Sequence, residues 1–549
     1  MEIKRVKFEI TFLFVITCLL SFFHLRVDMA QWTIFILRDC NAVQLLQLTC
    51  VMLHTIICIF LLLLLVIRSK IMAYVVFPFF FFVWAIPTCA RLIVGHCLYS
   101  ELITGALGTN WKEVSGFITP LTVICFLFGV VLCFGISYLC RNCFKWLQSL
   151  SGKLVWSIAI GYIGITMIAV SVLATYYPKS LIPILFAPSN AKGEEKVQLV
   201  KNQLAGMENE YRPQYPYRVL MPFYRQAALF YYIFDYYNVD KLKKAETLQA
   251  SLVCDDDIVV VLFIGESYRA DHASWNGYFR ETLPYLTKEK GNIINFPYFK
   301  SYATTTASSI YGMLSDATCN NREARHTSFI GLMNKYGFSS RLLLCRTTGW
   351  HRNPKINSVL DGQLKSVYMS DDSESLLGEF ENIILKGGKQ FILIEDGTGH
   401  APYEHESRFA IFGTKDKDRY DSCLLQTDEL LYRLIQKLKG KKAVMLYSSD
   451  HGQSFGEQGC SMHGGALNVV SQRHVFSFVW TSELFEKAHL GQIQAMQNNA
   501  KKLLSHDDIY KSILSLSGIY CDVPAEDCGD FTAPLNRPEV TKFSLNEKE

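Results

Sequence analysis

The chain has 549 residues, which at roughly 150 residues per domain allows about three or four domains. Charged residues make up 19% of it and hydrophobic residues 50%, a balance that excludes a disordered or collagen-like chain. The formal charge is only +4, so we expect no nucleic-acid partner. This composition favours a membrane protein that also has a large polar part.

Five apolar runs precede residue 180. A membrane-spanning helix needs about 20 apolar residues, and four of the five runs reach that length. The first run follows a basic segment, as a signal peptide would, but residues 22–25 (FFHL) are not a small-residue cleavage site. The runs occupy residues 10–25, 43–67, 72–90, 117–140 and 154–177. We therefore predict an α-helical transmembrane domain of five helices over residues 1–178, with the first run retained as an anchor.

The basic residues near these runs indicate their orientation. They gather before the first run, between the second and third, and between the fourth and fifth: Lys4, Arg5, Lys7, Arg68, Lys70, Arg141, Lys145 and Lys153. Lysine and arginine mark the cytoplasmic side of a membrane. An odd number of helices then places everything after the fifth run outside the cytoplasm.

Residues 179–254 are expected to form a connector outside the membrane. It contains several prolines and eight tyrosines, Tyr211, Tyr215, Tyr217, Tyr224, Tyr231, Tyr232, Tyr236 and Tyr237. Aromatic rings with polar tips favour the headgroup region, which would make interfacial helices of this segment. The same rings could instead pack against the following domain, and the sequence leaves both interpretations open.

The pattern changes near residue 255. Residues 258–264 (IVVVLFI), 391–394 and 443–447 are short apolar runs typical of buried parallel strands, and polar helical segments lie between them. This alternation predicts an α/β sandwich with a largely parallel sheet over residues 255–530. Residues 531–549 are expected to form a loose C-terminal tail.

Polar side chains follow these strands directly. Glu266 comes after the first strand, and Asp450 and His451 come after the last. Ligands of such sheets bind beyond the carboxyl ends of the strands, and carboxylates and imidazoles are suitable zinc ligands. His400 and His463 are further candidates at the same edge. We predict a divalent-metal site there.

A hydroxyl-rich segment, residues 303–309 (ATTTASS), precedes an apolar run. Ser and Thr are favoured helix N-caps, so capping is one interpretation. The other places a nucleophilic hydroxyl at a helix N-terminus beside a metal, where an incoming phosphate is also favoured. The residues alone do not choose among the five hydroxyls.

Seven cysteines follow residue 250, and an odd number leaves at least one unpaired. Cys521 and Cys528 are the best candidate for a disulfide.

The ordered motifs resemble the bacterial phosphoethanolamine transferases, which modify lipid A and other surface glycans and include the mobile colistin-resistance enzymes. The resemblance begins with residues 265–271 (GESYRAD), 276–278 (NGY) and 280–284 (RETLP). It continues through residues 295–296, the hydroxyl segment with Met313, 399–400, 449–452 (SDHG) and 462–464 (MHG). It implies a helical membrane domain and an alkaline phosphatase/sulfatase-like α/β domain.

The resemblance also implies roles for single residues. Glu266, Asp450 and His451 match zinc ligands, and Thr306 matches a nucleophile that also binds zinc. His400 and His463 match histidines that contact the phosphoryl group or a second zinc ion. The substrate-binding candidates are Asn110 and Glu113 near the lipid donor and Lys355 near the phosphate.

The chain departs from the family pattern in two places. Tyr302 and Gly312 stand where family members often carry a disulfide around the nucleophile loop. Glu395 stands where some members have a histidine. These departures bear on the acceptor and on fine geometry rather than on the class of reaction.

The implied reaction is zinc-dependent transfer of phosphoethanolamine from phosphatidylethanolamine to lipid A or the lipopolysaccharide core, through a phosphothreonine-type intermediate with release of diacylglycerol. The expected protein is a monomer in the bacterial inner membrane with a periplasmic catalytic domain. Modified lipid A would bind polymyxin and other cationic peptides less tightly. A phosphoglycerol transferase and a non-catalytic scaffold are the alternatives, whereas no C/S-x-P-x-R motif of a sulfatase lies near Thr306.

Overall fold

The computed structural model describes residues 248–545, with gaps at 254–255, 321–323, 327, 348, 361, 458–460, 465–468 and 524–527, and seven single helical positions between 127 and 161. Within these residues no helix is both long enough and apolar enough to cross a membrane. Apart from the seven single positions, the predicted membrane runs lie outside the described residues, as does nearly all of the connector. By its contacts the chain divides into two units, and the unit of residues 93–118 and 231–549 contains the described domain.

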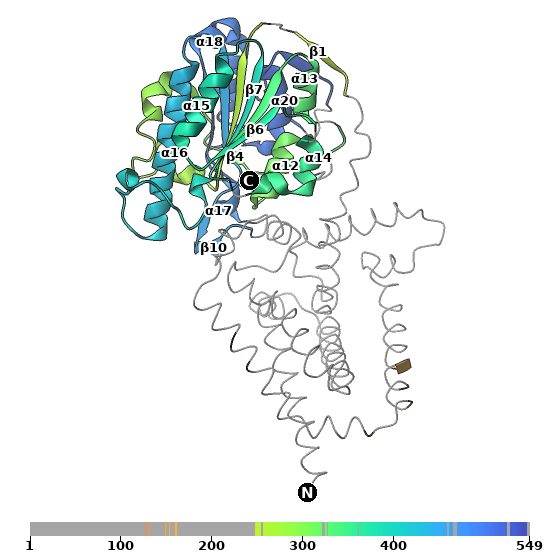
Figure 1. The fold of residues 1–549 in the computed structure, drawn as a ribbon, viewed down its shortest axis with the longest axis vertical. Helices are drawn as coiled ribbons and strands as arrows, with labels where there is room; N and C mark the ends of the chain where they lie inside the picture. The colour runs from red at the N-terminus through yellow and green to blue at the C-terminus, as the bar shows by residue number, and fades with distance from the viewer. Residues whose placement is uncertain are drawn as a thin grey trace. The chain divides into compact units, whose positions relative to one another are not determined.

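A seven-stranded sheet forms the centre of this domain, in the order β3-β11-β8-β2-β7-β5-β6 (Figure 1). The strands are β2 (Val259–Gly265), β3 (Ile293–Asn295), β5 (Ser339–Cys345), β6 (Ser366–Ser370), β7 (Gln390–Asp396), β8 (Ala443–Ser449) and β11 (Ser477–Thr481). The five from β8 to β6 are parallel, and β11 is antiparallel to both β8 and β3. The predicted α/β domain with a largely parallel sheet is confirmed, and the antiparallel edge makes the sheet mixed.

Helices cover both faces of this sheet, with α15 and α16 on one face and α12, α13 and α20 on the other (Figure 1). The α-helices are α12 (Thr306–Leu314), α13 (Phe329–Lys335), α14 (Pro354–Leu360), α15 (Ser373–Ile384), α16 (Asp416–Leu438), α17 (Val470–Arg473), α18 (Glu483–Ala488), α19 (Leu490–Asn499) and α20 (Ile509–Leu516). Alternate residues of β2 enter opposite cores: Leu262 joins the α12 side and Phe263 the α16 side. Because both faces are buried, β2 is a continuous apolar run rather than an alternating one.

Short elements complete the domain. The two-stranded sheets pair β1 (Ala250–Leu252) with β13 (Ile519–Cys521), β4 (Phe299–Lys300) with β12 (Leu504–Ser505), and β9 (Ser454–Phe455) with β10 (Ser461–Met462). The 3-10 helices are η3 (Ala270–His272), η4 (Ser274–Asn276), η5 (Leu286–Asn292), η6 (Trp350–Arg352), η7 (Gly397–Gly399), η8 (Ser407–Phe409) and η10 (His506–Asp508).

The register of the central strands brings their ends together. Gly265, the last residue of β2, pairs with Asp396 at the end of β7 and with Ser449 at the end of β8. All three strands run in the same direction, so the segments that follow them leave one edge of the sheet side by side. We call it the carboxyl edge.

The predicted loose C-terminal tail is wrong for the residues that the structure describes. Phe531 is fully buried, and Nδ2 of Asn499 donates hydrogen bonds to the carbonyl oxygens of Phe531 and Ala533 at 3.0 and 2.7 Å. Both terminal nitrogens of Arg537 contact the carboxylate of buried Asp508, at 2.6 and 2.7 Å. The segment is polar in sequence, yet it satisfies groups that would otherwise be buried without partners.

The predicted disulfide between Cys521 and Cys528 is also wrong, because both cysteines are free. Cys521 ends β13 and pairs with Ala250 of β1. The thiol of Cys528 instead faces the carbonyl oxygen of Asp316, with the sulfur 3.9 Å away. Closeness in sequence did not make these two thiols partners, since each is held by a different part of the domain.

Replacing Arg537 with alanine should destabilise the domain. Asp508 would stay buried without its charged partner, and we expect the free energy of unfolding to fall by about 2–3 kcal/mol. Lys487→Ala is the control, since Lys487 is 75% exposed and only 3.8 Å from an equally exposed Glu483; that change should cost at most about 0.5 kcal/mol. Urea unfolding followed by tryptophan fluorescence measures both. Equal effects would mean that the C-terminal segment contributes nothing.

Candidate metal and nucleophile site

Two carboxylates and one imidazole converge at the carboxyl edge. The ligand atoms of Glu266, Asp450 and His451 lie within 4.8 Å of one another, and all three side chains are almost completely buried. Nε2 of His451 is 3.2 Å from Oδ2 of Asp450 and 3.6 Å from Oε1 of Glu266. The structure therefore brings together the three residues that the strand pattern placed at this edge.

Thr306 lies against this cluster as the first residue of α12. Its Oγ1 is 3.2 Å from Nε2 of His451 and 3.3 Å from Oε2 of Glu266. Ser309, another hydroxyl of the same segment, is used differently, because its Oγ accepts a hydrogen bond from the amide of Ala303 at 3.2 Å. The tertiary structure thus singles out the hydroxyl that lies beside the cluster.

The donor set suits a divalent cation such as zinc. Oδ2 of Asp450 is buried and makes no hydrogen bond. Nδ1 of His451 lies 3.0 Å from the carbonyl oxygen of Gly452, which can only accept, so Nδ1 carries the proton and Nε2 has a lone pair. Such an imidazole, two carboxylates and the Thr306 oxygen would supply the four donors of a tetrahedral zinc site.

Burial changes the acidity of both carboxyl groups. Burial is the main cause and the nearby Asp450 charge the second, and together they raise the pKa of Glu266 to about 7. Burial likewise raises the pKa of Asp450 to about 7, although the amides of Ser267 and His451 oppose the shift. Two negative charges this close are costly without a cation, which is the electrostatic signature expected of a metal site.

Ser267 holds both carboxylates in place. Its hydroxyl donates to Oε1 of Glu266 at 2.7 Å, and its amide donates to Oδ1 of Asp450 at 2.9 Å. Its backbone has φ of 66°, a left-handed conformation that is uncommon for a residue other than glycine. The hydroxyl of Tyr420 donates to its carbonyl oxygen at 2.7 Å and fixes the turn. Sequence reasoning missed this role, since only the tertiary contacts reveal it.

His400 and His463 join the cluster as predicted neighbours. The ring centroids of His463 and His451 are 4.4 Å apart, and those of His463 and His400 are 5.6 Å apart. Burial lowers the pKa of His463 well below its usual range, and the other two histidines add to the effect. His463 is therefore neutral at pH 7. The residue before His400 is a glycine, Gly399, because any side chain at this position would overlap the carbonyl oxygen of Glu266.

The segment around Thr306, residues 302–312, is held without a disulfide between its two ends. Tyr302 and Gly312, the two positions of the expected bracket, are in contact, because the Tyr302 ring fills the place that a Cβ at Gly312 would take. The amide of Tyr302 donates to Nδ1 of His506 at 3.0 Å, while Nε2 of His506 lies 3.0 Å from the carbonyl oxygen of Ser449. His506, which the sequence did not single out, thus ties this segment to the end of β8.

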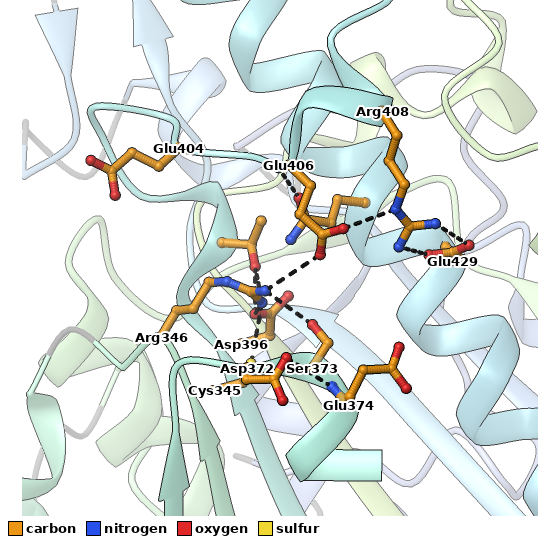
Figure 2. A network of polar contacts seen from close by, with 12 residues as sticks. Cys345, Arg346, Asp372, Ser373, Glu374, Asp396, Glu404, Glu406, Arg408 and Glu429 are labelled. Atoms are coloured by element: carbon orange, nitrogen blue, oxygen red, sulfur yellow. Dashed lines mark hydrogen bonds and ion pairs between the residues drawn. The ribbon is translucent and has the colours of Figure 1, made fainter.

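Arg346 connects the ends of β5 and β7. Figure 2 shows its guanidinium group pointing toward Asp396 and Ser373. It lies 3.5 Å from Oδ1 of Asp396 and donates to the hydroxyls of Thr398 and Ser373 at 3.2 and 3.0 Å. Because Thr398 is two residues before His400, this network braces the segment that carries His400.

Glu395 is a fully buried carboxyl group at the end of β7. Burial raises its pKa well above the usual range, and the charges of Glu266 and Asp396 raise it further. This carboxyl group stands in the place where the resemblance led us to expect a histidine in some family members.

The remaining predicted residues are not part of the described cluster. Lys355 lies in α14, which runs beside α12, and its side chain is outside what the structure describes. Asn110 and Glu113 lie outside the described residues altogether. Their assignment to substrate binding stays a prediction.

Comparison with known proteins gives consistent matches. Residues 258–519 match the family Sulfatase. The phosphatidylethanolamine transferase Mcr-1 of Escherichia coli is 28% identical over 320 residues, covering 50% of this chain and 56% of that protein. The phosphoethanolamine transferase EptA of E. coli K12 is 26% identical over 298 residues, covering 48% and 53%. The chain therefore spans about half the length of the curated relatives it matches.

One solved structure resembles nearly the whole chain. It is the integral membrane protein lipooligosaccharide phosphoethanolamine transferase A (EptA) from Neisseria meningitidis, with a TM-score of 0.61 and 19% identity. The match covers 93% of this chain and 95% of that one. At this identity the likeness concerns the fold.

Removing the Ser267 hydroxyl should weaken metal binding. Ser267→Ala and Ser267→Gly both lose the hydrogen bond to Glu266, and we expect each to bind zinc about tenfold or more less tightly. Glycine also relieves the left-handed backbone, so the metal-free glycine variant should be more stable than the alanine variant by about 1 kcal/mol. Chelator competition measures the affinities. Wild-type affinity in the glycine variant would show that only the backbone shape matters.

Zinc binding should depend strongly on pH. Both Glu266 and Asp450 have a pKa raised to about 7 without metal, so below pH 7 protons occupy the groups that the cation needs. We expect the affinity to fall on the order of 100-fold from about pH 8 to pH 6. Calorimetry in buffers of different ionisation enthalpy should show roughly one to two more protons released on zinc binding at the lower pH than at the higher. A flat profile would contradict the shared buried site.

Proposed function

We propose that the chain transfers phosphoethanolamine from phosphatidylethanolamine to lipid A or the lipopolysaccharide core. The match of residues 258–519 to the family Sulfatase and the likeness to phosphoethanolamine transferases support this proposal. The observation that carries the proposal is Thr306. Its hydroxyl lies at the N-terminus of α12, in contact with Glu266 and His451. This is where a phosphoryl acceptor side chain and a metal would have to meet.

In the first step, Oγ1 of Thr306 attacks the phosphorus of the donor lipid. A P–O bond forms to Thr306, the P–O bond to diacylglycerol breaks, and diacylglycerol leaves as the alcohol. The amides of the first turn of α12 face the nonbridging oxygens, where partial positive charge favours a phosphate. Zinc held by Glu266, Asp450, His451 and Thr306 would favour the ionised hydroxyl and offset phosphoryl charge.

In the second step, a hydroxyl or phosphate of the acceptor attacks the phosphoethanolamine on Thr306. The new P–O bond replaces the bond to Thr306, and the threonine hydroxyl is restored. His463 is neutral and buried next to His451, so it can accept the proton that an acceptor hydroxyl loses. His400 lies beside it and is the second candidate for moving a proton.

The membrane assignment belongs to this proposal. Five apolar runs precede residue 180, and both proposed substrates are lipids of a bilayer. We therefore propose a monomeric inner-membrane protein with five membrane helices and a periplasmic catalytic domain. Asn110 and Glu113 would lie near the lipid donor and Lys355 near its phosphate. Loss of negative charge on lipid A would then reduce polymyxin binding.

A transfer assay with head-group-labelled phosphatidylethanolamine tests the proposal. In membranes, Thr306→Ala should lower transfer by at least about 1,000-fold and leave no phosphoethanolamine on the protein. Thr306→Ser keeps a hydroxyl and should retain part of the activity and the covalent intermediate. Ser308→Ala, two residues along the same helix, is the matched control and should stay near wild type.

Mass spectrometry of the protein and of the lipid extract reads out both products. Labelled ethanolamine phosphate on Thr306 and on a glycolipid supports the proposal, and the modified lipid identifies the acceptor. Full activity in Thr306→Ala would refute the nucleophile. Consumption of a glycerophosphate donor in place of the labelled lipid would make the chain a phosphoglycerol transferase.

A further inference from the structure

Two loops of the carboxyl edge carry large apolar side chains in solvent. Phe279 is 79% exposed on the segment that follows β2, and Ile411 is 64% exposed on the segment that follows β7. Phe412, next to Ile411, is half-buried. Single exposed apolar residues are ordinary, but a cluster built from two loops at the same edge of the sheet as the candidate site indicates a binding partner.

Arg280 joins the two loops into one surface. Its guanidinium carbon lies 5.3 Å from the centre of the Phe279 ring and 5.4 Å from the centre of the Phe412 ring. Two hydrogen bonds of 2.6 Å anchor the same group to Asp418 and to fully buried Asp421 on α16. We call Phe279, Arg280, Ile411 and Phe412 the apolar ledge. The anchored guanidinium group thus lies near both aromatic rings.

Folding does not account for the exposed part of the ledge. The rings and the isoleucine side chain gain nothing from water, and burying such groups is worth roughly 25 cal/mol per Å². Arg280 is neutralised by its two aspartates, so the ledge presents aromatic and aliphatic tips rather than a free cation. Exposed Lys415 and Lys417 follow Phe412 along the chain, with exposed Asp416 between them.

We propose that the apolar ledge inserts into the headgroup–acyl boundary of a phospholipid bilayer. Aromatic and aliphatic tips flanked by lysines are the chemistry of interfacial membrane contacts, and the lysines suit anionic headgroups. We expect the chain itself to be anchored in a bilayer, since five apolar runs of spanning character lie in its first 180 residues. The ledge and the site share one edge of the sheet, so this contact would bring the site to the level of the lipid headgroups.

This inference rests on the proposed function for its biological purpose but not for its physical test. In that setting the ledge binds the surface that holds the substrate and does no chemistry. Loss of the ledge should therefore weaken use of membrane-held donor while leaving reaction of a dissolved donor unchanged. This split separates a docking surface from a part of the catalytic machinery.

Photocrosslinking tests the contact directly. The full chain carries p-benzoylphenylalanine at position 279 and is reconstituted in nanodiscs of phosphatidylethanolamine and phosphatidylglycerol. The matched control carries p-benzoylphenylalanine in place of Leu385. Leu385 is 70% exposed and lies between α15 and the start of β7, at the edge of the sheet opposite the carboxyl edge. We expect phospholipid adducts at position 279 at least about fivefold above position 385. Equal adducts at both positions, no adducts, or adducts to a second copy or another protein would overturn the proposal.

Kinetics supply the second arm. Phe279→Ser combined with Ile411→Ser should raise KM for phosphatidylethanolamine in vesicles about tenfold and leave kcat/KM for dissolved dihexanoyl-phosphatidylethanolamine within about twofold. Leu385→Ser should change neither value. Equal losses on both donors, or no change on either, would contradict the ledge. If no protein turns over either donor, the proposed function fails, while the crosslinks still decide the membrane contact.

Discussion

The burial of two carboxylates side by side is the constraint on which the rest of this domain depends. Glu266 and Asp450 follow neighbouring parallel strands, and the register of β2 and β8 leaves them no room to separate. Leaving both charged in a buried crevice is costly unless a cation is present. The turn at Ser267 lowers that cost by giving one hydrogen bond to each. The same turn has a left-handed backbone at Ser267, so the backbone is locally strained at the candidate site.

The segment around Thr306, residues 302–312, meets this pair from another part of the chain. Three contacts position it without a covalent bracket: the Tyr302 ring on Gly312, the bond from Tyr302 to His506, and the bond from the amide of Gly464 to the carbonyl oxygen of Thr304, at 2.7 Å. His506 contacts both the segment around Thr306 and the end of β8. It therefore helps to fix the position of the Thr306 hydroxyl relative to the carboxylate of Asp450. A buried neutral imidazole can do this because one nitrogen accepts and the other donates.

The carboxyl edge carries both the candidate site and the apolar ledge. Its centre gathers the buried side chains of the candidate site, and exposed Phe279 and Ile411 of the apolar ledge lie on loops of the same edge. Parallel strands explain the combination, because every loop that follows β2, β7 or β8 emerges at this one edge. Arg346 and Arg280 act similarly at their own positions, since Arg346 contacts Asp396 at the end of β7 and Arg280 contacts Asp418 and Asp421 of α16. Chemistry and surface contact can then be altered separately.

The sequence by itself determined the features that depend on local order along the chain. Continuous apolar runs predicted β2, β7 and β8, and the polar residues after them predicted the meeting of Glu266, Asp450 and His451, because parallel strands must end at one edge. Composition and periodicity left five hydroxyls open, the family resemblance pointed to Thr306, and the tertiary structure places Thr306 beside that cluster. Only the tertiary structure decided that Ser267 and His506 hold the site and that β11 runs antiparallel. It also overturned the Cys521–Cys528 pair and the loose tail. The physical reason is that these features depend on distances between segments far apart in sequence, which composition and periodicity do not encode.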